Sequence, residues 1–497
     1  MPVLVFGAAV AFFAWFIGNR LEFNLDEAGY LEGAVRVLHG AIPYRDFFVL
    51  TGPATFWNVA FFFRLFGVKL SSARLLLVLD LSILTACVYW LGSKMMSMGR
   101  TLGLTAAFAA LLMLYPGNLI VNHRWDSAAL SLVGISCFYA ALASSKNRWL
   151  FCAAGLFAAY AAWATPSMIL VLGGMFVWLV VAKDYRSVGF CAAGAAFVCL
   201  PIGLFLLATE SLQPMIEHLR WTAAHYSNPS RIFYGGIFAG YGALFHDAHG
   251  LMLVLLVLFT GLLILPACAP LVAALGFLKN HRAFRGQERF LFLSGLLVVL
   301  SCYPRMDIAH VAAATPLSFL MAAVSLPSLL PVRLRFYAGV VFSFAMCFFV
   351  SAFILERANL YTSESRAGQI AGDRQELSFV HSLERAVKPG ERLFVFPYMP
   401  IAYFLTGGTN PTRFAFLHPG LMTDQDESQA LSDLEKYPPT KVVYAPLAAS
   451  DLLRMFPGSD VSRLRMSRIE AWLAAHYQED SKYLIDKPGV QLLVKRF

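Results

Sequence analysis

NLDEAGYLEGAVRVLHGAIPYRDFFVLTG, residues 24–52, is a polar stretch that directly follows an apolar N-terminal segment. It carries six acidic or basic side chains in a chain that is mostly apolar. Its periodicity predicts a short amphipathic helix that ends near Gly40, with an apolar face made of Tyr30, Leu31, Ala34, Val35 and Leu38. Asp26 and Glu27 therefore stand side by side at the beginning of a helix, just past an expected membrane boundary.

Two interpretations of this acidic pair are open. In the first, one carboxylate is a catalytic base that lies near a lipid headgroup, with the other beside it. In the second, the pair belongs to the helix start: Asn24 is the N-cap and Glu27 completes a capping box three residues later. Acids in a first turn also suit the helix dipole. The spacing alone does not separate the two interpretations.

The composition indicates an integral membrane protein. Of 497 residues, 58% are hydrophobic and only 14% are charged, whereas soluble domains contain about 25% charged residues. Acids and bases balance in residues 356–497, so the net charge of +9 belongs to residues 1–355. We attribute this excess to membrane orientation and expect no nucleic-acid partner. The eight cysteines lie in apolar segments and suggest neither a disulfide framework nor a metal site.

Eleven apolar segments are candidates for membrane spans, which need about 20 residues, or fewer when packed among neighbours. They cover residues 2–18, 71–91, 101–119, 127–143, 149–164, 167–182, 188–208, 250–275, 290–303, 309–330 and 336–355. The segment 54–66 is also apolar, but it is short and interrupted by Arg64, so we expect an interfacial helix there. We interpret residues 2–18 as a retained first span, because neither a basic region nor a cleavage pattern accompanies them.

Basic residues between these segments predict how the protein lies in the membrane. The positive-inside rule places alternate connections in the cytoplasm, and their cations are Lys94, Arg100, Lys146, Arg148, Lys183, Arg186, Lys279, Arg282, Arg285, Arg289, Arg333 and Arg335. With an odd number of spans and a cytoplasmic N-terminus, residues 356–497 lie outside the cytoplasm.

Residues 356–497 have an ordinary soluble composition and alternate between helical and strand patterns. The patterns predict helices over 373–387 and 463–477 and strands over 392–396, 441–444 and 490–494. The predicted fold is thus a polytopic α-helical membrane domain, residues 1–355, followed by a small extracytoplasmic α/β domain, residues 356–497.

Polar residues of unusual type gather on the expected outer face of the membrane domain. Carboxylates there can activate a hydroxyl group, and arginines can bind an anionic leaving group with a planar set of donors. This combination suits transfer from a lipid phosphate carrier. The candidate residues are Asp26, Glu27, Arg45, Asp126, Tyr303, Arg305 and His310, together with Arg74 near the outer end of the second span.

Structural explanations for several of these residues stay open as well. Asp126 begins a span, where an N-cap is common. Arg305 and His310 could be interfacial anchors. Arg74 and Asp80 lie inside the second span, where charges are expensive and must face protein or a water-filled cavity.

Four motifs follow one another in residues 20–90: the acidic pair Asp26-Glu27 after the first span, the turn from Gly40 to Asp46, Gly52-Pro53, and Ala73-Arg74 at the start of the second span. In these motifs the chain resembles bacterial membrane glycosyltransferases of the GT-C superfamily. The branch that it resembles contains protein O-mannosyltransferases, the lipid A aminoarabinose transferase and lipopolysaccharide-core galacturonosyltransferases. The resemblance continues in order, but more weakly, toward residue 330.

The resemblance implies a multi-pass protein of the bacterial inner membrane whose active site faces the periplasm or the cell exterior. The donor would be a polyprenyl-phosphate-linked sugar, transferred with inversion to a glycolipid, polysaccharide or protein acceptor. Catalytic roles would fall to Asp26 as general base, to Glu27 beside it, and to Asp126 in the second outer loop. The expected substrate- and phosphate-binding residues are Arg74, Arg305, His310, Arg45 and Tyr303.

Two details of the chain bear on cofactors and on phosphate binding. There is no HExxH motif or Cys/His cluster, so no tightly bound metal is required, and a divalent cation shared by Asp26 and Asp126 stays open. Where many relatives carry a lysine before the proline after the fifth span, this chain reads Ala164-Thr165-Pro166. A phosphate contact made there in relatives lacks its usual side chain here.

Two other classes of protein compete with the enzyme hypothesis. A lipid-linked-sugar transporter or flippase would also have many spans with buried charges, but such proteins more often show internal repeats and broken helices at the midplane. A non-catalytic membrane scaffold would tolerate replacement of Asp26. The charges of this chain cluster at one interface, which favours the glycosyltransferase.

The predicted topology can be measured with reporter fusions. A reporter inserted between Lys279 and Arg289 should lie in the cytoplasm, and one fused to the C-terminus should lie outside it, because basic loops stay on the cytoplasmic side. A fusion between Lys279 and Arg289 that reports from outside would overturn the orientation and the placement of the candidate site.

Overall fold

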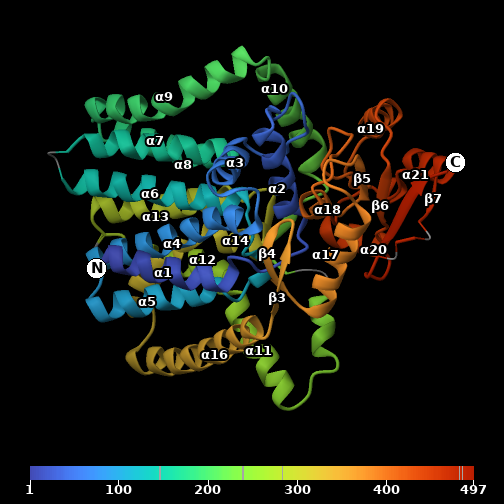
Figure 1. Cartoon of the computed structure of the whole chain (residues 1–497). Helices are drawn as coiled ribbons and strands as arrows, with labels where there is room; N and C mark the ends of the chain where they lie inside the picture. Colours follow the sequence, from blue (N-terminus) through green and yellow to red (C-terminus); the bar gives the residue numbers. More distant parts are fainter. Residues whose placement is uncertain (145–146, 238–239, 283, 481, 484, 497) are drawn as a thin grey trace.

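The structure is a computed structural model that describes residues 1–496 except 145–146, 238–239, 283, 481 and 484. Lys146, one of the predicted cytoplasmic cations, lies outside the described residues. Most of the chain is helical, and a smaller α/β region follows the last long helix. The N-terminus lies at the end of the helical bundle away from this region (Figure 1).

A bundle of long helices forms the larger part of the molecule. In Figure 1, α1, α4, α5, α6, α7 and α9 lie side by side with nearly parallel axes, and neighbours such as α6 and α7 are in direct contact. The bundle comprises α1 (Pro2–Ile17), α4 (Leu70–Met95), α5 (Met98–Leu112), α6 (His123–Ala143), α7 (Trp149–Ala164), α8 (Ile169–Val181), α9 (Tyr185–Ala208), α11 (Leu251–Leu263), α12 (Leu265–Asn280), α13 (Gly286–Leu300), α14 (Ile308–Ala314), α15 (Pro316–Leu329) and α16 (Val332–Ala358).

Every predicted span corresponds to a helix or to a bent pair of helices, but fewer than eleven meet a strict criterion for spanning. Among the described residues, α4, α6, α9 and α16 are long and apolar enough to cross a membrane. The pairs α11–α12 and α14–α15, bent by 54° and 77°, raise the number to six if each pair is one span. The other predicted spans form α1, α5, α7, α8 and α13, each with 16 residues or fewer.

Shorter helices lie at the end of the bundle that faces the α/β region. The predicted amphipathic helix is α2 (Leu25–Leu38), followed by α3 (Ala54–Phe66) and later by α10 (Leu212–Trp221). Asn24 caps α2 by accepting a hydrogen bond from the amide of Asp26 at 2.9 Å, so the predicted N-cap is confirmed. The capping box is not formed, because the side chain of Glu27 pairs with Arg74 instead.

The C-terminal region has the predicted α/β character. A four-stranded sheet has the order β5-β6-β8-β7, in which β5 and β6 are parallel and the other pairs antiparallel. Its elements are α17 (Arg374–Ala386), β5 (Leu393–Pro397), α18 (Ile401–Thr406), α19 (Asp424–Lys436), β6 (Lys441–Ala445), α20 (Ala449–Met455), α21 (Ser467–His476), β7 (Tyr477–Glu479) and β8 (Gln491–Lys495). All five predicted elements are present within a few residues of their expected bounds.

Two strand pairs were not predicted. The hairpin of β3 (Tyr361–Ser365) and β4 (Gly368–Gly372) follows α16, and β1 (Ile232–Gly236) pairs in parallel with β2 (Arg305–Asp307), in a segment expected to be a loop. Main-chain hydrogen bonds also join the C-terminal region to loops of the bundle. They run from Leu21 N to Ala371 O at 2.7 Å, from Leu70 N to Ala367 O at 2.8 Å and from Phe48 N to Arg413 O at 2.9 Å.

The contact between α7 and α9 depends on glycine. A Cβ atom at Gly155 would lie 2.0 Å from the carbonyl oxygen of Cys191, and one at Gly194 would lie 1.8 Å from that of Cys152. Small residues let membrane helices approach closely in this way. The backbones of α7 and α9 therefore touch, with no room for a methyl group.

Gly194→Ala should lower the stability of the protein by about 1–3 kcal/mol, the usual cost of forcing an extra methylene into a packed interior. Thermal unfolding of the purified protein in detergent would measure the loss. Gly189→Ala on the same helix is the matched control, because a Cβ there meets nothing within 4 Å. Equal unfolding temperatures for the two variants would contradict the proposed helix contact.

Candidate active site

A large cavity lies where the bundle meets the α/β region. Its volume is about 1020 Å³. One wall comes from the start of α2, a second from residues 226–237, a third from β2 and the start of α14, and a fourth from Tyr398 and residues 454–457 of the α/β region. Apolar side chains of α11, including Phe259 and Leu263, line another part. The cavity thus combines a polar end with an apolar surface.

Asp26 presents its carboxylate to this cavity. The side chain is exposed, and its Oδ2 accepts a hydrogen bond from the Nδ2 of Asn122 at 3.0 Å. Asp26 and His310 also line an adjoining chamber of about 40 Å³, together with Arg124. Such a volume holds about three water molecules. Asp26 therefore stands where a large cavity and a small polar chamber meet.

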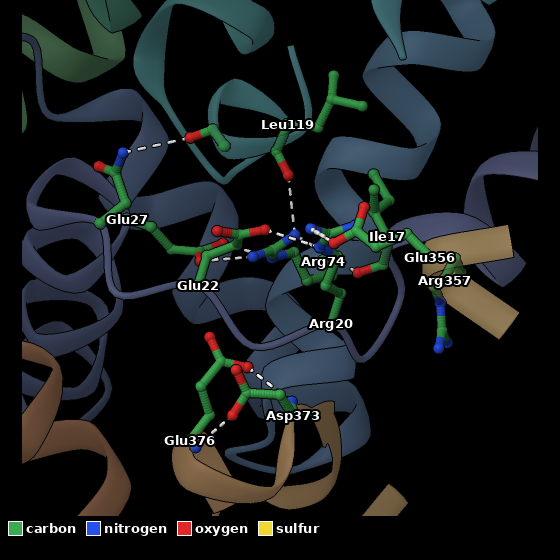
Figure 2. Close-up of polar contacts among 12 residues, drawn as sticks. Ile17, Arg20, Glu22, Glu27, Arg74, Leu119, Glu356, Arg357, Asp373 and Glu376 are labelled. Carbon is green, nitrogen blue, oxygen red and sulfur yellow. Dashed lines mark hydrogen bonds and ion pairs between the residues drawn. The ribbon is translucent and has the colours of Figure 1, made fainter. Parts of the chain in front are cut away.

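Glu27 has the opposite placement. It is fully buried in an ion pair with Arg74, whose Nη2 donates to its Oε2 at 2.6 Å (Figure 2). Arg74 also donates from Nη1 to the carbonyl of Leu119 at 2.8 Å, and Glu27 accepts from the amide of Val121 at 3.0 Å. Neither side chain lines the cavity. The roles of Glu27 in catalysis and of Arg74 in phosphate binding stay predictions.

Arg305, Asp307 and His310 form a connected polar group on the cavity wall. The Nε of Arg305 donates to Oδ2 of Asp307 at 2.9 Å, and the Nδ1 of His310 lies 2.7 Å from Oδ1 of the same carboxylate. Burial alone would raise the pKa of Asp307, but the hydrogen bond and charge of His310 and the charge of Arg305 hold that pKa well below its usual value. Asp307 therefore stays ionised and keeps the guanidinium in place.

The remaining predicted site residues lie elsewhere. Asp126 is buried, and its Oδ2 accepts hydrogen bonds from Thr55 at 2.9 Å and Asn58 at 2.8 Å, both on α3. Arg45 is exposed and pairs with the neighbouring Asp46. Tyr303 is 60% exposed and is not part of the cavity lining. Of the expected set, Asp26, Arg305 and His310 come together in the cavity.

Several cavity residues were absent from the predicted site. Arg124 lies two residues before Asp126 at the start of α6, and its buried Nε has no hydrogen-bond partner among the described residues. Tyr398 and Arg454 come from the α/β region, where no sequence signal pointed to the site. Burial raises the pKa of Tyr398, and the charge of Asp26 raises it further, so the phenol stays protonated.

The Ala164-Thr165-Pro166 segment has a structural explanation. The amide of Gly52 donates to the carbonyl of Ala164 at 3.1 Å, and a Cβ at Gly52 would lie 1.8 Å from the carbonyl of Trp163. The hydroxyl oxygen of Thr165 lies 2.7 Å from Nδ1 of His123. Two of the sequence motifs thus pack against each other beside the start of α6.

A metal site is not apparent in the part of the chain that the structure describes, where no three or more His, Cys, Asp or Glu side chains gather in one place. Asp26 faces the cavity while Asp126 is bonded to α3. A divalent cation shared by these two residues stays a prediction.

Breaking the buried ion pair should lower the free energy of unfolding of the protein. Glu27→Gln and Arg74→Gln should each cost about 3–5 kcal/mol, because each leaves an uncompensated buried charge. Unfolding curves in detergent would measure both, and the double variant should cost less than the sum of the two. Additive losses would mean that the two side chains are not coupled.

Comparison with known proteins gives a family match over part of the bundle. Residues 51–212 match the sequence family described as dolichyl-phosphate-mannose-protein mannosyltransferase. No curated protein matches the chain in sequence.

Solved structures match over nearly the whole chain. ArnT from Cupriavidus metallidurans bound to undecaprenyl phosphate is 12% identical with a TM-score of 0.60, and the match covers 99% of this chain and 97% of that chain. The apo state of the same protein gives 13% identity and a TM-score of 0.59 over the same shares. The archaeal oligosaccharyltransferase AglB from Archaeoglobus fulgidus, in complex with an inhibitory peptide and a dolichol-phosphate, is 12% identical with a TM-score of 0.50 and is matched over 89% of this chain and 69% of that chain.

Identities this low establish a shared fold, and the family match adds a shared sequence pattern within the bundle. The fold of ArnT extends through the α/β region, since almost the whole of both chains is covered. The chain thus shares a sequence pattern with the dolichyl-phosphate-mannose-protein mannosyltransferase family over residues 51–212, and it has the fold of ArnT over 99% of its length.

Proposed function

We propose that this protein transfers a sugar from a polyprenyl-phosphate-linked donor to an acceptor hydroxyl, with Asp26 as the general base. The observation that carries the proposal is the placement of one exposed carboxylate, Asp26, in a large cavity that also contains the guanidinium of Arg305. Two of the matched structures contain a lipid phosphate, undecaprenyl phosphate in ArnT and a dolichol-phosphate in AglB, which supports a lipid phosphate as the carrier.

In this mechanism the acceptor oxygen attacks the anomeric carbon of the donor sugar. The new carbon–oxygen bond forms as the bond from the anomeric carbon to the phosphate oxygen breaks, and its electron pair leaves with the phosphate. Asp26 takes the proton of the acceptor hydroxyl, which a carboxylate in contact with that hydroxyl can do. A single displacement of this kind inverts the configuration at the anomeric carbon.

Two guanidinium groups are placed to stabilise the departing phosphate. Arg305 points into the cavity with its Nη2 free of partners among the described residues, while Nε and Nη1 are bonded to Asp307 and to the carbonyl of Met455. Arg124 has an unpaired, buried Nε beside the small chamber. Planar donors of this type bind phosphate oxygens in pairs. Arg74, in contrast, would act indirectly by fixing Glu27 and the start of α2.

The wider setting is part of the same proposal. We infer that residues 1–355 form the catalytic membrane domain and residues 356–497 an extracytoplasmic domain in a bacterial inner membrane. The reaction then takes place on the periplasmic or exterior side, where nucleotide sugars are absent and a lipid-linked donor is required. The acceptor would be a glycolipid, a polysaccharide or a protein.

Asp26→Asn should reduce sugar transfer by roughly a hundredfold or more, because an amide cannot accept the hydroxyl proton. The fold should survive, since Asn suits the start of a helix as well as Asp and only a few tenths of a kcal/mol of charge–dipole energy is lost, as an order-of-magnitude estimate. The assay is turnover by the purified protein with a panel of polyprenyl-phosphate sugars.

Asp46→Asn is the matched control, because Asp46 lies in the same stretch but pairs with Arg45 outside the cavity. It should retain normal transfer. A folded Asp26→Asn protein with normal turnover would remove Asp26 as the base, and equal losses in both variants would mean that the assay reports a general effect of lost negative charge.

A further inference from the structure

A short segment of the α/β region reaches into the active site. Residues 454–457 comprise the last two residues of α20 and the two that follow it, and they line the large cavity. The Nη1 of Arg305 donates to the carbonyl oxygen of Met455 at 2.8 Å. The guanidinium carbon of Arg305 also lies 5.3 Å from the centre of the Phe456 ring, within the range of a cation–π interaction. The arginine is thus bound on one side by β2 and on the other by a segment that is 150 residues away in sequence.

The position of Phe456 is fixed by contacts on several sides. The residue is buried, and its ring centre lies 4.4 Å from that of His418 and 6.0 Å from that of Tyr226. The pKa of His418 falls to about 4, because burial disfavours its charged form and Arg305 repels it further. A neutral imidazole therefore packs against the ring of Phe456 in a T-shaped arrangement, with 74° between the two ring planes. The ring of Phe456 cannot move without disturbing both neighbours.

Gly458 brings the same segment against the loop that carries Tyr226. Its amide donates to the carbonyl of Pro229 at 3.0 Å. A Cβ atom at Gly458 would lie 2.5 Å from the carbonyl oxygen of Asn228, which is too close for any side chain. Residues 226–229, Arg305 and residues 454–458 therefore meet in one three-way contact at the cavity wall.

We propose that residues 454–458 belong to the active site and contribute to the reaction. Phe456 is a positioning residue: it keeps the guanidinium of Arg305 directed toward the leaving phosphate. This inference rests on the proposed function for its chemical meaning. The α/β region then takes part directly in the reaction, because it helps to orient Arg305. Asp307 holds the guanidinium on one side, and Met455 and Phe456 hold it on the other.

The ordinary alternative is that Phe456 only fills space in the α/β region. Phe396 in β5 provides the comparison, because it is also buried and lies in the core of the same region without lining the cavity. Phe456→Leu keeps an apolar side chain but removes the aromatic face, and Phe396→Leu makes the same change away from Arg305. A space-filling role predicts the same behaviour for both variants.

The test is binding of undecaprenyl phosphate to the purified full-length protein in detergent. Phe456→Leu should weaken binding about tenfold, of the order expected when a desolvated cation–π contact is lost, whereas Phe396→Leu should change it less than twofold. Phe456→Tyr should bind undecaprenyl phosphate as the wild type does, because the aromatic ring is kept. In a protein that already carries Arg305→Gln, Phe456→Leu should not weaken binding further. A residue that acts only through Arg305 has no effect on binding once that arginine is gone.

Hydrogen exchange at residues 305–307, measured without any ligand, gives a second and independent readout. Exchange there should be faster in Phe456→Leu than in wild type and unchanged in Phe396→Leu. Equal behaviour of the two leucine variants, or a full additional loss in the Arg305→Gln background, would overturn the inference. A wild-type protein that binds no undecaprenyl phosphate would contradict the proposed function instead, and the exchange measurement would still decide whether Phe456 positions Arg305.

Discussion

The buried ion pair between Glu27 and Arg74 is the constraint on which the site depends. Burying an ion away from water costs on the order of several kcal/mol, unless the ion is paired with an opposite charge and hydrogen-bonded. Here Arg74 also binds the carbonyl of Leu119 and Glu27 binds the amide of Val121. The start of α2, the start of α4 and the segment before α6 are therefore fixed to one another. Successive residues of a helix are turned by about 100°, so burying Glu27 turns Asp26 away from the bundle and into the cavity.

This pair also explains what the sequence could and could not reveal about the site. The acidic pair at a helix start was visible from residues 24–52, as was the need of Arg74 for a polar environment inside a span. The spacing could not rank the two carboxylates, because their difference comes from a partner 47 residues away. The same long-range contact engages Arg74, whose role as a phosphate ligand stays a prediction. Local patterns predict which residues are unusual, but only the fold decides which of them meet.

Secondary structure was predictable where the periodic signal was long. The strands β5, β6 and β8 and the helix α17 follow alternating or amphipathic patterns and lie close to their expected bounds. The pair β1–β2 escaped prediction because its strands have five and three residues, and the helices α11, α12 and α13 separate them in the chain. The contribution of Phe456 to the cavity wall had no local signal either, since nothing in its own stretch differs from an ordinary buried aromatic residue.

The attachment of the α/β region to the bundle has a consequence for how the chain can diverge. Its hydrogen bonds to Leu21, Phe48 and Leu70 join main-chain groups, and such bonds place no demand on the identity of the side chains. Substitutions can therefore accumulate on both sides of this junction while its geometry is retained. This accounts for a fold shared with ArnT over 99% of the chain at 12% identity, while the family's sequence pattern ends at residue 212.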